Sequence, residues 1–382
     1  MATAAVVGTG FIGPVHVEAL RRAGVTVRGI LGINPEESRR AAAALGLTVA
    51  YDAFDDLLRD RAVEAVHLAT PNKTHLSMAT AALEAGKHVV CEKPLAMNSA
   101  ETSQLVALSQ SHPHQAAAVN YNIRFYPLMH HARDLVKSGG IGAVYSVRGG
   151  YIQDWLLYDT DWNWRLLPDE GGDLRAVGDI GTHWMDLIHF ITGLEAEKLV
   201  ADLGVLIPVR RKPRTAVATF KGKEQQAEPV EYDSVDIRTE DWGSVLFRYQ
   251  GGAHGSMSVS QATAGRKNRL EFEIAGSKAS LAWNSENPNE LWMGHRERPN
   301  EIVIKDPSLL SDSGRAIASQ PGGHAEGFPD TFKQLYRTFY GYIAAGDFSA
   351  PRPFPTFEDG HQEVVLCERI LQSQREGRWV DV

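Results

Sequence analysis

Three glycines near the N-terminus constrain the fold of this chain most strongly. They follow directly after the apolar run 4–7 and precede a stretch whose apolar residues have helical spacing. In a strand–turn–helix unit the first glycine permits a tight turn, the second lets the backbone approach a pyrophosphate, and the third lets the helix pack on the strand. The motif therefore predicts a dinucleotide site. Its expected residues are Gly8, Gly10, Phe11, Ile12 and Gly13.

The first 120 residues alternate short apolar runs with amphipathic stretches. This order predicts a parallel sheet with right-handed crossovers and helices on both faces, and hence a Rossmann domain over residues 1–124. The expected strands are 4–7, 25–33, 65–69, 88–91 and 116–119. Because ligands bind outside the carboxyl ends of parallel strands, the residues that follow each strand are the candidates for a site.

Past residue 125 the pattern changes. Six segments have strand character without regular intervening helices, which implies mostly antiparallel neighbours. They are 144–151, 199–206, 233–238, 244–249, 255–260 and 269–275. Helices are expected at 180–191, 330–345 and 357–376. A chain of 382 residues suits two domains, so residues 125–382 are predicted to form a second, α/β domain.

Composition excludes several classes of protein. The net charge of -8, without a basic stripe among aromatic residues, argues against a nucleic-acid partner. The sequence contains no run of 18 or more apolar residues, so no membrane span is predicted. The two cysteines, Cys91 and Cys367, lie too far apart in sequence for a redox pair and suit free thiols in a reducing cytoplasm. With no basic leader at the N-terminus, we expect a cytoplasmic protein.

The end of the second strand bears on the choice of cofactor. An acidic residue there would bind the adenosine ribose and favour NAD, but Gly32 and Asn34 stand in its place. Arg39 and Arg40 lie about one turn into the next helix, where they either reach a 2′-phosphate or cover a solvated helix face. The sequence therefore favours NADP, with NAD as the alternative.

The turn Glu92-Lys93-Pro94-Leu95 resembles the EKP motif of the Gfo/Idh/MocA family of oxidoreductases, which includes glucose–fructose oxidoreductase and inositol dehydrogenase. The early glycine motif and the segments 69–72 and 178–183 extend the resemblance along the chain. It implies an NAD(P)-dependent dehydrogenase or reductase with a Rossmann domain and a C-terminal α/β domain. The open sheet of that domain often serves oligomerisation, so a homodimer or homotetramer is expected.

The resemblance also implies roles for single residues. Lys93 matches a lysine that contacts substrate and the nicotinamide ribose, whereas Asp179 and His183 match the catalytic aspartate and histidine. Asn120 and Arg124 occupy the stretch that usually borders the nicotinamide, and Arg124 is also a candidate substrate contact. The remaining cofactor contacts are expected at Thr70, Pro71, Asn72, His75 and Glu92.

These residue types suit the oxidation of a secondary alcohol, in which the alcohol gives a hydride to the nicotinamide and a proton to the protein. Histidine is a suitable base near neutral pH. His183 lies four residues after Asp179, so on a helix the carboxylate can orient the imidazole or bind a substrate hydroxyl. Lys93 can polarise the reacting oxygen. The alternative is an ordinary helix-surface pair. A metal is not expected, because no set of three or four ligands is apparent.

The segment 151–165 bears on the substrate, because it holds three of the eight tryptophans together with two tyrosines and three aspartates. Aromatic faces beside polar groups suit sugars, although the tryptophans can equally plug a domain interface. The candidate substrate contacts here are Asp154, Trp162 and Arg165. His324, in the glycine-rich loop 321–328, is a further candidate, and a plain connector is the alternative for that loop.

The predicted function is hydride transfer between nicotinamide and a secondary alcohol or ketone of a sugar, cyclitol or sugar derivative. Two alternatives stay open. One is a glycosidase that retains its NAD and oxidises the sugar only transiently. The other is a catalytically silent dinucleotide sensor.

Overall fold

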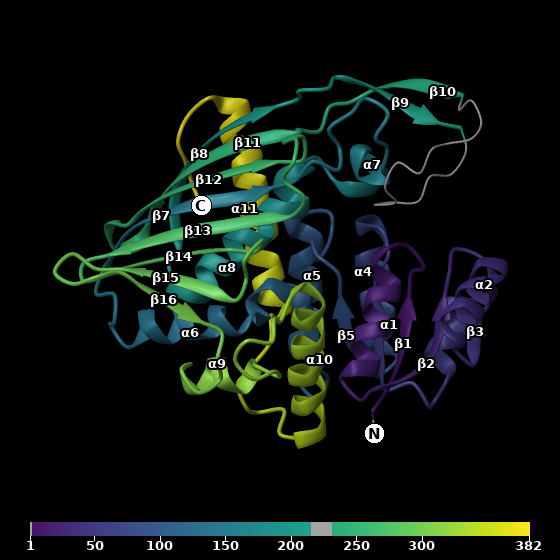
Figure 1. Ribbon diagram of the computed structural model, residues 1–382. Helices are drawn as coiled ribbons and strands as arrows, with labels where there is room; N and C mark the ends of the chain where they lie inside the picture. Colours follow the sequence, from purple (N-terminus) through teal and green to yellow (C-terminus); the bar gives the residue numbers. More distant parts are fainter. Residues whose placement is uncertain (1, 215–230) are drawn as a thin grey trace.

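The computed structural model describes residues 2–214 and 231–382. Figure 1 shows two sheets, one in the N-terminal domain and a larger one in the C-terminal domain. Among the described residues, no helix combines the length and apolar character needed to cross a bilayer.

The N-terminal sheet is parallel throughout and has the strand order β3-β2-β1-β4-β5-β6. Its strands are β1 (Thr3–Val7), β2 (Thr26–Leu31), β3 (Val49–Tyr51), β4 (Ala65–Leu68), β5 (His88–Cys91) and β6 (Ala117–Val119). The connecting helices are α1 (Ile12–Arg22), α2 (Pro35–Leu45), α3 (Phe54–Arg59), α4 (His75–Glu84) and α5 (Ser99–Ser111). Every residue of β4 and β6 is buried, as expected for a sheet covered on both faces. The predicted Rossmann fold is confirmed.

The C-terminal sheet is open and has the order β16-β15-β14-β13-β7-β12-β11-β8-β17 within the described residues. Among the described strands of this sheet, only the β7–β12 pair is parallel, so the prediction of mostly antiparallel neighbours is confirmed. Its strands are β7 (Val144–Ile152), β8 (Ala196–Gly204), β11 (Trp242–Tyr249), β12 (His254–Ser260), β13 (Arg269–Gly276), β14 (Ser280–Asn284), β15 (Glu290–Gly294), β16 (Glu301–Ile304) and β17 (Val380–Asp381). A separate ribbon pairs β9 (Val209–Pro213) with β10 (Tyr232–Asp236).

Helices cover one face of this sheet and leave the other open (Figure 1). The buried core between sheet and helices draws on α6 (Pro127–Lys137), α8 (Thr182–Thr192) and α11 (Phe357–Glu376). Burial alternates along β11, where Val245 and Phe247 are buried and Leu246 and Arg248 are exposed. This period of two is typical of a sheet with one solvated face.

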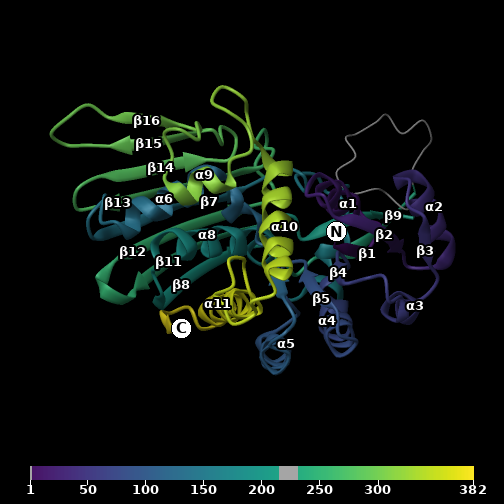
Figure 2. The ribbon, with the colours of Figure 1, turned by 90° about the horizontal axis from the view of Figure 1, so that it is seen from below.

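One late helix returns to the N-terminal domain. Phe332, Tyr336 and Phe339 of α10 (Phe328–Ala345) share a buried cluster with Val6 and Leu20 of the Rossmann domain. Figure 2 shows α10 at the boundary between the two sheets. The last strand of the N-terminal sheet thus ends at Val119, but the core of this domain is completed by a helix from the last sixth of the chain.

Candidate active site

The loop after β5 and a turn before α8 meet at the candidate catalytic cluster. Lys93 Nζ lies 2.8 Å from Asp179 Oδ1 and 2.6 Å from the main-chain oxygen of Asp179. Arg165 Nε donates to the same Oδ1 at 3.0 Å, and Gln261 Nε2 donates to Oδ2 at 2.9 Å. The structure therefore brings together three predicted residues, Lys93, Asp179 and Arg165, and adds Gln261, which the sequence analysis missed.

These donors keep Asp179 ionised in a buried place. Burial raises the pKa of a carboxyl group, but here the charges of Arg165 and Lys93 outweigh it and hold the pKa of Asp179 far below its usual value. Asp179 also belongs to a π-helical turn, Val177–Gly181, that precedes α8. Such turns occur frequently at functional sites.

The start of that turn is fixed by a buried carboxylate. Glu240 accepts hydrogen bonds from the main-chain nitrogens of Arg175, at 2.9 and 3.0 Å, and of Val177, at 2.8 Å. These are nitrogens that a helix start leaves without partners inside the helix. Glu240 is therefore a positioning residue for the turn that presents Asp179.

His183 lies one turn further on, in α8, and only 8% of it is exposed. Its ring packs edge-on against Tyr121 and Tyr151, with centroids 5.6 and 6.1 Å apart. Its Nδ1 is buried and has no hydrogen-bond partner among the described residues. Burial and the charge of Lys93 lower the pKa of His183 to about 3, so the imidazole is neutral and able to accept a proton.

The predicted contact between the aspartate and the histidine differs from expectation. Within the described part of the chain, neither oxygen of Asp179 bonds to His183. The reason is the π-helical turn together with the three donors from other segments that occupy the carboxylate. Asp179 thus holds Lys93 and Arg165, and the helical-face argument from the i, i+4 spacing does not describe the pair.

The glycine motif has the geometry of a dinucleotide site. A Cβ added to Gly8, whose φ is +112°, would lie 2.2 Å from the oxygen of Ala69, and one added to Gly13 would lie 2.0 Å from the oxygen of Gly8. By contrast, a Cβ added to Gly10 meets no atom within 4 Å. The space beside Gly10, at the N-terminus of α1, therefore fits a pyrophosphate.

An acid that the sequence analysis missed lies close to the end of β2, in the first turn of α2. Gly32 donates to Ser38 Oγ at 2.8 Å, and Asn34 caps α2 by accepting from the main-chain nitrogen of Glu37 at 2.9 Å. The carboxylate of Glu37 turns back and accepts a hydrogen bond from the hydroxyl of Thr9, inside the glycine motif. The acid expected at the strand end is thus supplied from the first turn of the next helix. Arg39 pairs with Asp52 at 3.2 Å on the exposed surface.

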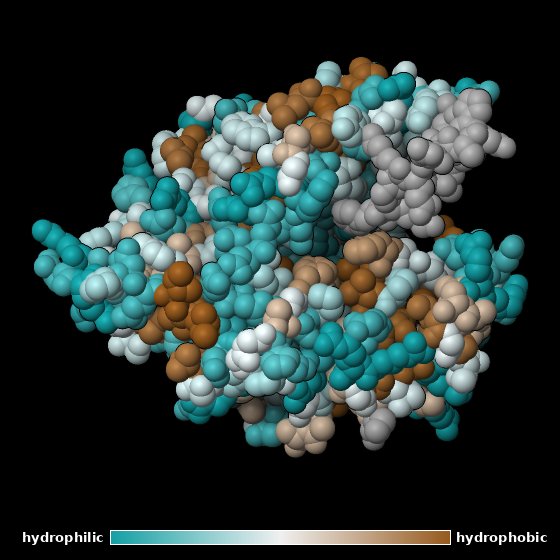
Figure 3. All heavy atoms as spheres, viewed as in Figure 1, coloured by the Kyte–Doolittle hydropathy of each residue, from teal (hydrophilic) through white to brown (hydrophobic). Residues whose placement is uncertain are grey.

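The loop after β4 joins the two domains. Asn72 Nδ2 donates to the main-chain oxygen of Gly171, at 2.8 Å, in α7 (Pro168–Gly171). Thr70 accepts a hydrogen bond from Thr74, and Pro71 directly precedes the short helical turn 72–74. Figure 1 shows α7 above α4, and Figure 3 shows a hollow between the domains on this face, with hydrophobic side chains on its Rossmann side. Phe11 and Ile33, which are 50% and 90% exposed, belong to that domain.

His75 and Arg124 do not contribute as expected. Both ring nitrogens of the buried His75 lie 2.9 Å from main-chain oxygens, those of Pro94 and Thr70, so it joins two loops of the site instead of facing a ligand. The guanidinium of Arg124 is buried in ion pairs with Asp186 and Asp359. Its Nε and Nη2 donate inside the protein, so the structure gives no support for the expected contact with cofactor or substrate.

The tryptophan-rich segment contributes one residue to the cluster. Arg165 stacks on Trp164, with 4.4 Å from its guanidinium carbon to the ring centroid, and reaches Asp179. Trp162 packs in a small apolar cluster with neighbours from the β9–β10 region of its own domain, so its packing differs from the domain-interface plug that was the alternative. Asp154 pairs with Lys267 at 2.6 Å.

His324 also departs from the prediction. Its side chain is exposed and lies 3.3 Å from the oxygen of Gly322, while its own main-chain oxygen accepts from the buried Lys305 at 2.7 Å. Its loop therefore has the contacts of a connector.

Comparison with known proteins gives the family. A model of the oxidoreductase family with an NAD-binding Rossmann fold matches residues 2–121, and a model of the GFO/IDH/MocA C-terminal domain matches residues 129–282. The chain belongs to the Gfo/Idh/MocA family. The predicted family, fold class and dehydrogenase activity on CH–OH groups are confirmed.

Individual relatives of this family member match over its whole length. It is 30% identical to levoglucosan dehydrogenase of Pseudarthrobacter phenanthrenivorans, over 98% of this chain and 97% of that protein. A levoglucosan dehydrogenase solved with NADH and L-sorbose superposes with a TM-score of 0.87 at 28% identity, covering 100% of this chain and 98% of that one. An inositol dehydrogenase homologue from Azotobacter vinelandii, solved with NADH and myo-inositol, gives 0.84 at 26% identity, with coverage of 100% and 97%.

Proposed function

We propose that this protein oxidises a secondary hydroxyl group of a cyclic polyol, either a sugar, an anhydrosugar or a cyclitol, with NAD as the hydride acceptor. The observation that supports this most directly is the buried, neutral His183 beside a lysine that is held in place by Asp179. Lys93 follows β5, and Tyr121, whose ring contacts His183, follows β6. Lys93 and His183 therefore both lie near the carboxyl edge of a sheet whose first turn fits a dinucleotide.

Each residue has a separate task in this proposal. The nicotinamide, when bound, accepts the hydride. His183 takes the proton of the hydroxyl group, and Lys93 donates a hydrogen bond to the oxygen as it gains negative charge. Asp179 orients the ammonium of Lys93, while Arg165 and Gln261 keep that carboxylate ionised and fixed.

The substrate class rests on the relatives and on the polar cluster. The solved relatives contain L-sorbose, levoglucosan or myo-inositol, all of which carry several hydroxyl groups on a small carbon frame. Arg165 and Lys93 are donors, whereas His183 is an acceptor, and a polyol can pair with both kinds of group. We expect the substrate to enter beside Arg165.

Glu37 favours NAD over NADP, contrary to the preference drawn from Gly32 and Asn34. Its carboxylate contacts the glycine motif, in the corner where a Rossmann domain receives the adenosine ribose. A carboxylate there accepts hydrogen bonds from ribose hydroxyls and repels a 2′-phosphate. Arg39, the expected partner of that phosphate, is paired with Asp52.

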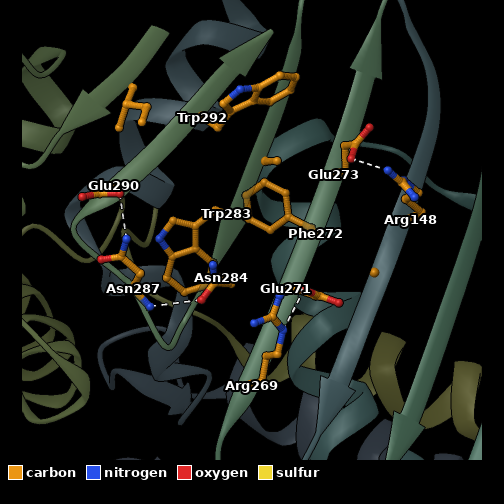
Figure 4. A pocket seen from close by; sticks show the side chains of 13 residues that line it. Arg148, Arg269, Glu271, Phe272, Glu273, Trp283, Asn284, Asn287, Glu290 and Trp292 are labelled. Atoms are coloured by element: carbon orange, nitrogen blue, oxygen red, sulfur yellow. Dashed lines mark hydrogen bonds and ion pairs between the residues drawn. The ribbon is translucent and has the colours of Figure 1, made fainter. Parts of the chain in front are cut away.

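The open face of the C-terminal sheet suits a homo-oligomer, as expected from the family resemblance. A groove of about 430 Å³ lies on this face. Figure 4 shows Trp292 and two ion pairs among the residues that line it. Arg148 pairs with Glu273, and Arg269 with Glu271, both at 2.5 Å. None of the residues lining the groove belongs to the catalytic cluster, so a second copy can cover it without blocking the site.

A spectrophotometric screen tests the proposed function. The purified protein is mixed with NAD+ or NADP+ and a panel of anhydrosugars, sugars, cyclitols and glycosides, and NAD(P)H formation is followed. We expect sustained NADH formation with a subset of the cyclic polyols. Glycoside cleavage without net NADH, by protein that retains its cofactor, would instead identify the glycosidase alternative. Binding of cofactor without turnover of any compound would favour the sensor.

A further inference from the structure

A buried carboxylate lies directly before the catalytic lysine. Glu92 Oε1 accepts hydrogen bonds from His16 Nε2 at 2.9 Å and from Asn120 Nδ2 at 2.5 Å. Glu92 Oε2 accepts from the main-chain nitrogen of Lys93 at 3.2 Å. The carboxylate is therefore surrounded by protein donors, which differs from the direct cofactor contact predicted for it.

A chain of hydrogen bonds continues from this carboxylate through the N-terminal domain. His16 Nδ1 lies 3.1 Å from His67 Nδ1, and His67 Nε2 lies 2.9 Å from the hydroxyl group of Tyr340. Both histidines are completely buried. The chain joins α1, β4 and α10, three elements far apart in sequence, and it ends at the EKP turn.

The chemistry of the groups fixes the direction of the last bond. Although burial raises the pKa of a carboxyl, hydrogen bonds and charge from His16, together with the charge of Lys93, lower the pKa of Glu92 to about 2. An ionised carboxylate only accepts hydrogen bonds. His16 Nε2 must therefore donate, and this holds for the neutral imidazole and for the imidazolium, which differ only in the direction of the bonds beyond His16.

The same reasoning orients the amide of Asn120. Because Glu92 only accepts, the nitrogen of this amide must face it, and the oxygen must face away. Asn120 Oδ1 is buried and has no partner among the described residues. A buried acceptor without a donor costs free energy, so its position calls for a donor from a ligand or an ordered water.

The site of this acceptor suggests which ligand supplies the donor. Asn120 follows β6 directly and Lys93 follows the neighbouring strand β5 by two residues, so both stand at the carboxyl edge of the sheet. We propose that Asn120 Oδ1 accepts a hydrogen bond from the carboxamide NH2 of the nicotinamide. We further propose that Glu92, His16, His67 and Tyr340 are positioning residues that hold this amide in the accepting orientation.

This inference rests on the nicotinamide cofactor of the proposed function, but it does not depend on the substrate. The test compares dissociation constants of NAD+ and its 3-acetylpyridine analogue, in which a methyl group replaces the NH2. Binding is measured by calorimetry without substrate. We expect the unaltered protein to bind NAD+ about tenfold more tightly, as one lost hydrogen bond implies. Equal affinities of the unaltered protein for NAD+ and the analogue would overturn the proposal.

Substitution of the acceptor is the second measurement. We expect Asn120→Ala to weaken the binding of NAD+ and to leave the binding of the analogue unchanged, so that the ratio of the two dissociation constants approaches one. If this variant keeps the melting temperature and the full ratio, Oδ1 is satisfied by water and the proposal is wrong. A failed substrate screen would bear on the proposed polyol dehydrogenase and leave these constants as they are.

The positioning chain is tested by a pair of variants at His16. Glutamine can still donate to Glu92 and leucine cannot, so His16→Gln should retain the preference for NAD+ and His16→Leu should lose most of it. Tyr340→Phe removes only the distal hydroxyl and should reduce the ratio less than His16→Leu. Equal ratios in all three variants and the unaltered protein would show that Asn120 needs no such support.

Discussion

Lys93 Nζ contacts both the carboxylate and the main-chain oxygen of Asp179, at 2.8 and 2.6 Å. One ammonium group therefore links the π-helical turn of the C-terminal domain to the Rossmann domain. The two side chains are 10% and 13% exposed, so solvent screens the pair little. Because Arg165 and Gln261 also bind Asp179, this carboxylate keeps two donors if the lysine is replaced.

Replacement of that lysine should separate catalysis from folding. Lys93→Met keeps the length of the side chain and removes its charge, and we expect kcat to fall by about 10²–10³-fold, as for the loss of one donor to a developing oxyanion. Cofactor binding should persist, as measured by NADH fluorescence. The matched control is Lys198→Met, which removes an exposed ion pair with Asp381 and should leave kcat unchanged. A Lys93→Met enzyme as active as this control would refute the catalytic role.

The low pKa of His183 predicts an unusual pH profile. Burial and the charge of Lys93 lower it to about 3, so the neutral, proton-accepting form persists well below the ordinary histidine value of 6.5. We therefore expect kcat/KM for alcohol oxidation to show no decline near pH 6.5 as the pH falls. Initial rates from about pH 5 to about pH 8 check this.

The Lys93→Met variant offers an internal control for the pH profile. Without the positive charge, the pKa of His183 should rise towards 6.5, although burial still lowers it. The residual activity of that variant should then decline at higher pH than that of the unaltered enzyme. A profile of the unaltered enzyme with its acid limb at 6.5 would mean that His183 is solvated or is not the base.

Two glycines of the first turn should respond differently to the same substitution. Gly13→Ala places a methyl group 2.0 Å from the oxygen of Gly8 and should lower the melting temperature, since overpacking costs about 1–3 kcal/mol. At Gly10 the methyl group meets no protein atom within 4 Å, so Gly10→Ala should keep the melting temperature and weaken NAD+ binding. Thermal unfolding with and without NAD+ distinguishes the two variants. A Gly10→Ala variant with full affinity for NAD+ would show that the pyrophosphate does not bind beside Gly10.

The parts of the site that could be predicted are those fixed by local backbone geometry. The glycine turn, the EKP turn and the stretch that contains Asp179 and His183 each have a recognisable order in a few residues. Three-residue β3 was missed because Val49–Tyr51 is too short to show a period. Gln261 was missed because it reaches Asp179 from the end of β12, 82 positions further along the chain, and nothing nearby in sequence indicates that contact.

Arg124 was misjudged and other residues were missed because exposure and partner choice depend on the tertiary structure. Arg124 lies in the predicted segment, yet Asp186 and Asp359 from two distant helices bury its charge. His16 and His67 sit in correctly predicted elements, but only the return of α10 with Tyr340 completes their hydrogen bonds. Glu37 had a local signal, because an acid at the third position of a capped helix points back to the helix start.

That acid gives the last prediction, which concerns cofactor choice. We expect the unaltered protein to bind NADH more tightly than NADPH, because the carboxylate of Glu37 beside Thr9 repels a 2′-phosphate. Glu37→Gln keeps a hydrogen-bond acceptor and removes the charge, so NADPH affinity should rise by about tenfold, as one like-charge contact at a protein surface implies. Glu36→Gln, at the neighbouring and exposed position, is the matched control and should change neither constant. Fluorescence titration of both cofactors with the unaltered protein and the two variants gives the three ratios of dissociation constants. Tighter binding of NADPH than of NADH by the unaltered protein would restore the preference for NADP drawn from Gly32 and Asn34. The role of Glu37 would then be limited to its hydrogen bond with Thr9 in the glycine motif.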